Sequence, residues 1–270
     1  MMMQSQLTTE GTKNRNEVTL MPIDTAALLA PPDIHTFRHI LCVQPHPDDV
    51  EVGMGGIVAA LADAGCRVTY LTVTNGDQGN VDPDAIPEET AATRRYEAEA
   101  SGRFLGVSHF IFLEHGDGTL ADVHSLSFEI AHVLREVKPD AVFTPDPWLP
   151  YEGHLDHIIT GKAVSSAFQL CGRRSIGDSP RTEPYPVPAI GYYFTANPNT
   201  IVDITDLFER KMTAIAMHES QTDEATLLLF RAYFEMNGRQ LGALKGYGLG
   251  EGVKLLSRLH THCFVDAVSI

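Results

Sequence analysis

Cysteine is scarce in this sequence. The 270 residues include four cysteines, and no two of them form a CxxC pair: Cys42, Cys66, Cys171 and Cys263. Cys42 and Cys66 lie in apolar segments, where a cysteine behaves as a small hydrophobic side chain. This spacing excludes a small disulfide-stabilised fold and is typical of a protein from a reducing compartment.

Positive charge is also in short supply. The chain has 20 Lys and Arg residues against 35 Asp and Glu residues, which gives a formal net charge of −15. Nucleic-acid-binding proteins need clusters of Lys and Arg to neutralise phosphates, so this composition excludes a nucleic-acid partner. We interpret the excess of acidic residues as a contribution to solubility.

Long apolar segments are lacking too. No apolar run approaches the roughly 20 residues that a membrane-spanning helix needs. The first residues of the chain are polar and lack the apolar core of a signal peptide. We therefore expect a soluble, cytoplasmic protein without a membrane partner.

The sequence does contain a regular alternation of short apolar segments with amphipathic ones. Buried parallel strands are continuous apolar runs, and helices connect them. The alternation therefore predicts an α/β, Rossmann-like fold, with a mostly parallel sheet and helices on both faces. The predicted strands cover residues 39–44, 67–74, 109–113 and 141–144, and the predicted helices cover residues 53–65, 88–105, 126–137 and 154–170.

The pattern is weaker toward both ends of the chain. Residues 1–15 are predicted to be disordered or extended, and residues 21–32 to form a short helix. We predict an N-terminal extension over residues 1–35 and a single domain over 36–270. Beyond residue 171 the predicted segments are a surface loop over 172–188, strands over 189–195 and 200–203, helices over 206–219 and 223–237, and an unassigned tail over 246–270.

The first predicted strand runs directly into the segment PHPDDVE at residues 45–51. In open α/β sheets, ligands bind at the carboxyl ends of the strands. The adjacent carboxylates of Asp48 and Asp49 repel each other unless a cation offsets their charge. With His46 beside them, the donors suit zinc, which accepts imidazole nitrogen and carboxylate oxygen.

A second group, HLDH at residues 154–157, follows the fourth predicted strand. His154 and His157 are three residues apart, so on a helix they share a face, and one can bind a metal while the other reaches a substrate. Asp156 can accept a proton from an imidazole and fix its tautomer. Two ligands from the first strand end and one from the fourth leave a zinc position open for water, which is typical of a catalytic site.

These motifs resemble those of the PIG-L/LmbE-like N-acetylglucosaminyl deacetylases. PHPDDVE and HLDH are similar to the HPDD(x)E and HxDH signatures of this family, and TNGDQGN at residues 74–80 is similar to its TxGDxG loop. Arg94 and Glu97 resemble its RxxE helix, and Ser220 with Gln221 resembles its SQ motif. The resemblance covers residues 38–221, and the order and spacing of the motifs make it specific.

The resemblance implies a zinc-dependent hydrolase that removes the acetyl group from an N-acetylglucosamine-type amino sugar and releases acetate. It implies that His46, Asp49 and His157 bind Zn²⁺ and that Asp48 is the general base. Zinc would polarise the amide carbonyl and lower the pKa of a bound water toward about 7. Because family members are often assemblies, a homo-oligomer is expected as well.

The resemblance also assigns roles around the metal. His154 is expected to stabilise the oxyanion or protonate the leaving amine, and Asp156 to orient and charge it. Arg94 resembles the family's contact to sugar hydroxyls, for which its planar guanidinium is suited. Trp148 is a candidate for stacking on a sugar ring. Tyr151, three residues before HLDH, is another candidate contact, although some members place a Tyr one residue closer.

Other features have simpler explanations. The glycines in residues 53–56 do not complete a dinucleotide-binding GxGxxG, because the third position is Val58, and they favour close packing of a helix on the sheet. His260 and His262 are predicted to share one face of a strand, as partly buried histidines or as contacts to an active site. Two alternatives to the main prediction are a metal-dependent amidase acting on a larger sugar conjugate and a non-catalytic Rossmann-type nucleotide-binding module.

Overall fold

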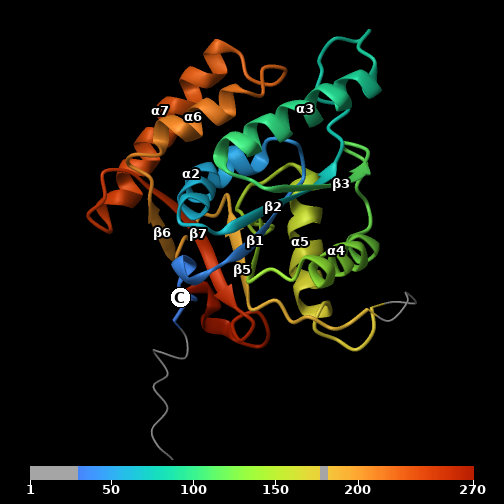
Figure 1. Ribbon diagram of the computed structural model, residues 1–270, viewed down its shortest axis with the longest axis vertical. Helices are drawn as coiled ribbons and strands as arrows, with labels where there is room; N and C mark the ends of the chain where they lie inside the picture. Colours follow the sequence, from blue (N-terminus) through green and yellow to red (C-terminus); the bar gives the residue numbers. More distant parts are fainter. Residues whose placement is uncertain (1–29, 177–181) are drawn as a thin grey trace, which may run out of the picture. The chain divides into compact units, whose positions relative to one another are not determined.

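A mixed sheet of seven strands forms the centre of the structure (Figure 1). The structure is a computed structural model that describes residues 30–176 and 182–270. The strands are β1 (His39–Gln44), β2 (Arg67–Thr74), β3 (His109–His115), β4 (Ala141–Pro145), β5 (Ala189–Tyr193), β6 (Thr200–Asp203) and β7 (Gly250–Ser257). They follow the order β3-β2-β1-β4-β5-β7-β6 across the sheet.

The first five strands run parallel, and β7 pairs antiparallel with both β5 and β6. The prediction of a mostly parallel α/β sheet is confirmed. Because β1 to β5 are parallel, the loops that follow them all open at one edge of the sheet, where α/β proteins bind ligands.

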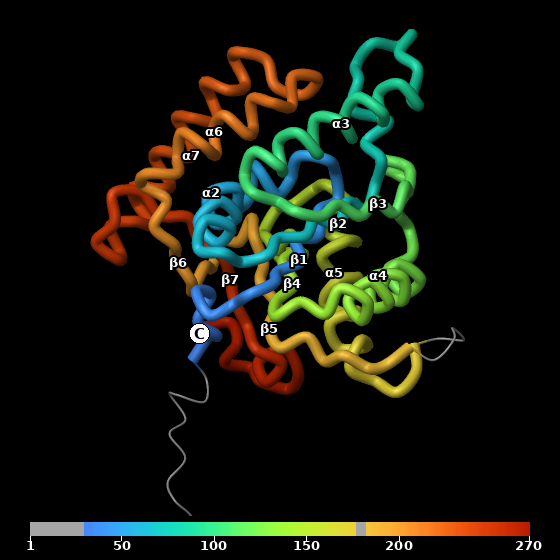
Figure 2. The backbone as a smooth tube through the Cα atoms, viewed as in Figure 1, coloured from blue at the N-terminus to red at the C-terminus, as the bar shows by residue number. Residues whose placement is uncertain are grey.

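Helices cover both faces of the sheet, as predicted (Figure 2). Helices α2, α3, α6 and α7 lie on one side, and α4 and α5 on the other. Their bounds are α2 (Asp49–Asp63), α3 (Pro87–Leu105), α4 (Val123–Val137), α5 (Leu155–Leu170), α6 (Phe208–Ala216) and α7 (Glu224–Ala243), and two 3₁₀ helices are η1 (Ile34–Thr36) and η2 (Val265–Val268).

The alternating side chains of β1 show why its sequence is continuously apolar. Ile40 and Cys42 belong to the core on the α2 side of the sheet, whereas Leu41 and Val43 belong to the core on the α4 and α5 side. All four residues are fully buried. A strand that is covered on both faces needs apolar residues at every position, since successive side chains point to opposite faces.

Helix α2 differs from its prediction. It begins at Asp49 rather than at residue 53, and Met54 has non-helical backbone angles that break it (φ −151°, ψ 25°). A buried ion pair between Lys211 and Glu251 bonds to both sides of the break. Lys211 donates from Nζ to the carbonyl of Val52 at 2.8 Å, and the amide of Ile57 donates to Glu251 Oε2 at 2.7 Å. The pair thus satisfies backbone groups that the break releases.

The tail of the chain contains an element that the sequence pattern did not resolve. Residues 246–270, left unassigned, include strand β7, which joins β5 to β6 inside the sheet. The prediction that His260 and His262 lie on a strand is wrong, because β7 ends at Ser257 and a turn follows. His260 is buried there and His262 is exposed, so the two side chains do not share an environment.

Some predictions fall outside the described residues. They are the disordered segment 1–15, residues 21–29 of the short helix, and residues 177–181 of the surface loop. Residues Pro31–Ile270 form one compact unit. The predicted boundary after residue 35 stays a prediction. Within residues 30–176 and 182–270, none of the helices combines the length and the apolar character that crossing a membrane requires.

Candidate active site

The loop after β1 is held in place by the end of β2. Gln44 donates from Nε2 to Thr72 Oγ1 at 2.9 Å, and its Oε1 accepts a hydrogen bond from the amide of Val50 at 3.1 Å. Thr74 donates to the carbonyl of Pro45 through both its amide, at 2.9 Å, and its hydroxyl, at 2.8 Å. These buried bonds fix the start of α2, and with it the PHPDD segment, against the sheet edge.

His46 lies among three carboxylates at this edge. Its Nδ1 is 3.2 Å from Asp49 Oδ2, and its Nε2 is 3.2 Å from Asp117 Oδ1 and 3.3 Å from Asp156 Oδ2. The four side chains are nearly enclosed, with at most 11% of any of them exposed. They come from the loops after β1 and β3 and from the first turns of α2 and α5, all of which lie at the carboxyl edge of the parallel strands.

Asp49 joins His46 to His157. One carboxylate oxygen faces His46, while the other, Oδ1, lies 3.2 Å from His157 Nε2. The amide of His46 also donates to Asp49 Oδ2 at 2.8 Å, which fixes the carboxylate to its own loop. The three predicted zinc ligands are therefore adjacent in space, although 108 residues separate Asp49 from His157 in the chain (157 minus 49).

The charges of this cluster depend on one another. Burial by itself would lower the pKa of His46, but hydrogen bonds with Asp117, Asp156 and Asp49 raise that pKa to about 12. Burial would raise the pKa of Asp49, but the neighbouring His157 and His46 bring it below its ordinary value. The carboxylates thus favour positive charge at this place, which a proton supplies here and a divalent cation can supply instead.

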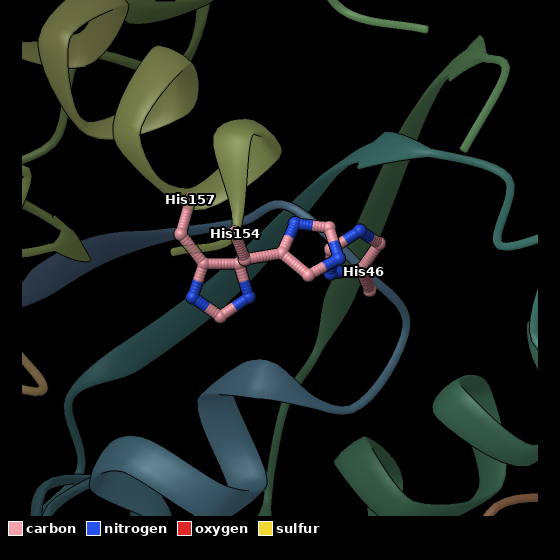
Figure 3. Close-up of side chains that lie close together, drawn as sticks. All are labelled: His46, His154 and His157. Carbon is pink, nitrogen blue, oxygen red and sulfur yellow. The ribbon is translucent and has the colours of Figure 1, made fainter. Parts of the chain in front are cut away.

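Three imidazoles lie close together at this site (Figure 3). His154 and His157 project from the start of α5 and His46 from the loop after β1, with ring centroids 4.5 to 5.4 Å apart. One nitrogen from each of the three lies within 4.8 Å of the others, and His46 forms a second such group with Asp117 and Asp156. Both groups are compatible with a metal ion.

The donor set of His46, Asp49 and His157 fits zinc, which accepts two imidazoles and a carboxylate. The other ring nitrogen of His157, Nδ1, is buried without a hydrogen-bond partner, and Glu152 Oε2 lies 3.6 Å from it. A carboxylate behind the imidazole is the usual support for a histidine that binds a metal, because it orients the ring and raises its basicity. These residues are therefore suited to hold the predicted cofactor.

Asp48 lies beside the cluster and is paired with an arginine. Its Oδ2 accepts a hydrogen bond from Arg94 Nη2 at 3.1 Å, and no side-chain bond to the helix N-terminus was found for it among the described residues. Arg94 is buried and also donates from Nη1 to the carbonyl of Gly76 at 3.1 Å. Its Nη1 lies 3.6 Å from Asp117 Oδ2. This bond fixes the orientation of the Asp48 carboxylate beside the donor set.

The remaining motifs of the resemblance, RxxE, SQ and TNGDQGN, are bonded to one another near Arg94. Glu97, one turn further along α3, accepts hydrogen bonds from the amide and the hydroxyl of Ser220. Gln221 donates from Nε2 to the carbonyl of Gly79 at 3.0 Å, which ties the SQ motif to the TNGDQGN loop. Hydrogen bonds thus join the RxxE, SQ and TNGDQGN motifs, which are far apart in the chain, and Gly79 of the last motif lies against Arg94.

His154 and Asp156 are placed differently from each other. His154 caps α5 with an exposed side chain, and burial together with the charges of His46 and His157 lowers its pKa. Asp156 is buried, contacts His46, and accepts a hydrogen bond from the amide of Gly118 at 2.8 Å. In the described parts of the chain no hydrogen bond joins Asp156 to His154.

Two residues of the site were missed in the sequence. Asp117 contacts both His46 and Arg94, and it follows β3 in the segment EHGDG. Its position just after β3, a parallel strand next to β2, was a signal that could have identified it. Glu152 had a weaker signal, namely an acidic residue shortly before HLDH in a loop rich in proline.

The predicted sugar contacts lie further out. Trp148 is 62% exposed and packs edge-to-face on Tyr192, with ring centroids 5.6 Å apart. Tyr151 is fully exposed and has a left-handed backbone conformation (φ 69°). Neither side chain contacts the histidines in the described structure. Gly53 was predicted to allow close packing of a helix on the sheet. An added Cβ would come within 2.4 Å of the Tyr193 ring, so the glycine permits close packing of α2 on β5.

Sequence comparisons agree with these motifs. The family of GlcNAc-PI de-N-acetylases, PIG-L, matches residues 41–168. The chain is 35% identical to the diacetylchitobiose deacetylase of Thermococcus kodakarensis over 83% of its own length and 85% of that protein. It is 30% identical to the probable N-acetyl-alpha-D-glucosaminyl L-malate deacetylase 2 of Bacillus cereus, over 69% of this chain and 84% of that protein.

Among solved structures, the N,N'-diacetylchitobiose deacetylase from Pyrococcus horikoshii is similar with a TM-score of 0.80 and 35% sequence identity. The match covers 86% of this chain and 89% of that one.

Proposed function

The chain belongs to the PIG-L family of de-N-acetylases, and on that premise we propose that it removes the acetyl group from an N-acetylglucosamine-type amino sugar, as a zinc-dependent hydrolase. The substrate is a small glycoside or a disaccharide, and the products are a free amine and acetate. One observation carries this proposal: Asp48, paired with Arg94, lies next to the His–Asp–His donor set without being part of it.

We assign the metal to His46, Asp49 and His157. When bound, zinc supplies the Lewis acid that polarises the amide carbonyl and makes water a stronger acid. The support for this assignment is the donor chemistry of the three side chains, together with the carboxylate of Glu152 behind His157 Nδ1. The carboxylates of Asp117 and Asp156 supply further negative charge, which stabilises positive charge at His46 and suits a divalent cation as well as a proton.

Asp48 is the general base in this proposal. Its carboxylate accepts the proton of the attacking water, and the hydrogen bond from Arg94 Nη2, at 3.1 Å, orients the carboxylate. The geometry suits a base because the residue adjoins a ligand and is partly accessible, with 22% of its side chain exposed. After the attack, the same carboxylate holds the proton that the departing amine needs.

His154 faces the reacting amide from the start of α5. Its position beside His46 and its exposure allow it to stabilise the developing oxyanion or to deliver a proton to the amine. We propose that Asp156 acts on His154 through its charge, which raises the pKa of the imidazole against the effects of burial and of His46.

The sugar contacts belong to the same proposal. Arg94 is the innermost of them, although its guanidinium is mostly engaged with Asp48, Gly76 and Asp117. Trp148 and Tyr151 are proposed as outer contacts, because both side chains are exposed on the loop that leads to His154.

Homo-oligomeric assembly and a cytoplasmic location are proposed as well, the latter supported by four free cysteines of which three are buried.

Acetate release from N-acetylglucosamine and from diacetylchitobiose tests the proposal, with the protein loaded with zinc and after chelation. We expect release that stops on chelation and returns with zinc. Asp48→Asn should lower kcat by about 10²- to 10⁴-fold, the usual contribution of a general base, while the bound zinc stays near one per chain. Glu114→Gln, at an exposed position on β3, is the matched control and should keep full activity.

Loss of zinc in Asp48→Asn would show that the two aspartates were assigned the wrong way round. A purified protein that binds no zinc and releases no acetate from either sugar contradicts the proposal itself. Activity on large conjugates alone would favour the alternative, an amidase that uses the same site. A nucleotide-binding module is not favoured, because Gly53–Gly56 lie within α2 and Gly53 packs against Tyr193.

A further inference from the structure

A cavity of about 540 Å³ opens beside the metal-binding residues and extends to helix α7. We call it the α7 cavity. Its inner end is formed by His157, Glu152 and Phe194, and its outer wall by Tyr233, Phe234 and Asn237. Its volume lies within the usual range for small-molecule sites, about 300–1,000 Å³, and is much larger than an acetyl group requires.

The cavity is continuous with the candidate active site through His157. One nitrogen of this imidazole faces Asp49 and the other faces Glu152, while the ring stacks nearly parallel on Phe194, with centroids 5.9 Å apart and planes at 11°. A molecule that is bound at the metal can therefore extend over Phe194 toward α7.

Phe194 is held in an unfavourable backbone conformation at this junction. Its φ of 53° lies in the left-handed region, which costs a residue with a Cβ about 1–2 kcal/mol. The conformation follows directly after the end of β5 and places the ring between His157 and Tyr193. Strain of this kind persists where the surrounding structure needs a side chain in one place, and binding sites are such places.

Helix α7 presents an aromatic ring and an amide to the cavity. Tyr233 and Asn237 are four residues apart, so they lie one above the other on the same face of the helix. Tyr233 is 53% exposed, which leaves its ring free to stack on a ligand. Gly238 brings the helix close to Leu249, the residue just before β7, because a Cβ there would lie 3.3 Å from the Leu249 side chain.

The floor of the cavity offers no free charge. Lys211 and Glu251 line it, but they are paired with each other and bonded to the backbone of Val52 and Ile57. The other acidic or basic side chains in the lining are Glu152 and His157. An anionic group would meet Glu152 without a free cation to balance it, so the cavity suits an uncharged polar ligand.

An uncharged ligand that is flat on one side and rich in hydroxyls matches this lining. Sugar rings place their C–H faces on aromatic rings and their hydroxyls on amides and carboxylates, and the cavity offers both kinds of partner. On the basis of the deacetylase activity proposed above, we propose that the α7 cavity binds the second sugar ring of the substrate. Tyr233 stacks on that ring, Asn237 bonds to its hydroxyls, and both are specificity-determining residues.

The test compares two substrates in the zinc-loaded protein: N-acetylglucosamine, which ends before the cavity, and diacetylchitobiose, which reaches it. Tyr233→Ala should lower kcat/KM for the disaccharide by about 10-fold, the worth of one aromatic stacking contact, and leave the value for the monosaccharide unchanged. Asn237→Leu should have the same selective effect. Tyr233→Phe, which keeps the ring, should retain the wild-type preference.

Tyr96→Ala is the matched control, since Tyr96 is an exposed tyrosine on α3 outside the cavity, and it should change neither value. Equal losses for both substrates, or no loss in any cavity variant, overturn the proposed subsite. A selective loss with longer N-acyl groups instead of a second sugar overturns it as well, because the cavity would then hold the acyl chain.

The subsite and the activity can fail separately. If the wild-type protein releases no acetate from either sugar, calorimetric titration with chitobiose, the deacetylated disaccharide, tests the subsite alone. Binding that weakens about 10-fold in Tyr233→Ala and is retained in Tyr233→Phe supports the subsite. Equal affinity in the wild type and in Tyr233→Ala, or no binding at all, overturns it.

Discussion

The two sides of the active site offer opposite kinds of side chain. On the side of α3, Asp48, Arg94 and Asp117 are charged and paired with one another, and we call this the charged side. On the side of α7, Phe194 and Tyr233 present aromatic rings. The charged residues that line the cavity with them, Lys211 and Glu251, are paired with each other. We call this the aromatic side. In the proposed mechanism, the side chains that take part in proton transfer are thus separated from those that contact only the remote part of the substrate.

The sheet explains this separation. Asp117 follows β3 at one edge of the strand order, and α7 packs on β7 and β6 at the other edge. The His–Asp–His donors follow β1 and β4, which lie between them. A substrate that crosses the carboxyl ends of the strands meets charge at one end and aromatic surface at the other. Substitutions on each side can therefore test whether reaction rate and substrate choice are separable.

The largest effect is expected from the buried Lys211–Glu251 pair, which lines the cavity on the aromatic side. Glu251→Gln should lower the free energy of unfolding by about 3–5 kcal/mol, because it leaves the buried ammonium of Lys211 without its charge partner. Glu209→Gln is the same substitution in the exposed pair with Arg231 and should cost at most about 1 kcal/mol. Urea denaturation of the two variants measures both values, and similar losses would mean that the buried pair is not what stabilises the break in α2.

Arg94→Met should be the most damaging change on the charged side apart from loss of Asp48 itself. The substitution removes the hydrogen bond to Asp48 and the positive charge that lies near Asp117. We therefore expect kcat/KM to fall by about 10²-fold with both substrates. Steady-state acetate release measures this. A loss confined to the disaccharide would contradict the division between the two sides.

Glu152→Gln acts where the two sides meet. The carboxylate lies 3.6 Å from His157 Nδ1, and removal of such a support weakens metal binding by about 10- to 100-fold. Competition with a zinc chelator gives the affinity. Glu183→Gln, an exposed carboxylate that pairs with Lys138, serves as the control. Unchanged zinc affinity in Glu152→Gln would show that this carboxylate has no part in holding the metal ligand.

A smaller effect concerns the pH dependence of stability. Burial lowers the pKa of His218, which lies near Glu51, Glu97, Asp48 and Arg94. The unfolded chain therefore binds a proton more readily than the folded one, so this histidine contributes stability above about pH 6.5 and the contribution is lost as the pH falls further.

The measurement is the free energy of unfolding of the wild type and of His218→Asn between pH 7.5 and 5. The wild type should lose more stability over this interval, by at most about 1.4 kcal/mol per pH unit. His262→Asn, at an exposed histidine, should follow the wild type. Parallel curves for wild type and His218→Asn would refute the assignment to His218.

The pattern of the sequence was sufficient for most of the fold, for a local reason. The central residues of β1 and β4, 40–43 and 141–143, are continuously apolar because both faces of the sheet are covered, and that signal is visible without any tertiary contact. The start of α2 was missed because Asp49 and Glu51 in its first turn follow closely after Pro47 and Asp48, a combination typical of a loop. Strand β7 was missed because Gly250 and Gly252 weaken its pattern and its neighbours are remote in sequence.

The sequence by itself determined that the PHPDDVE and HLDH motifs meet near the ends of β1 and β4, because side chains that follow parallel strands lie at one edge of the sheet. Only the tertiary structure decided which carboxylates join them. Asp117 and Glu152 have no motif, and they reach His46 and His157 through the paths of their loops. The α7 cavity is likewise a product of packing, since Tyr233 comes near Phe194 and His157 only when α7 docks on β7.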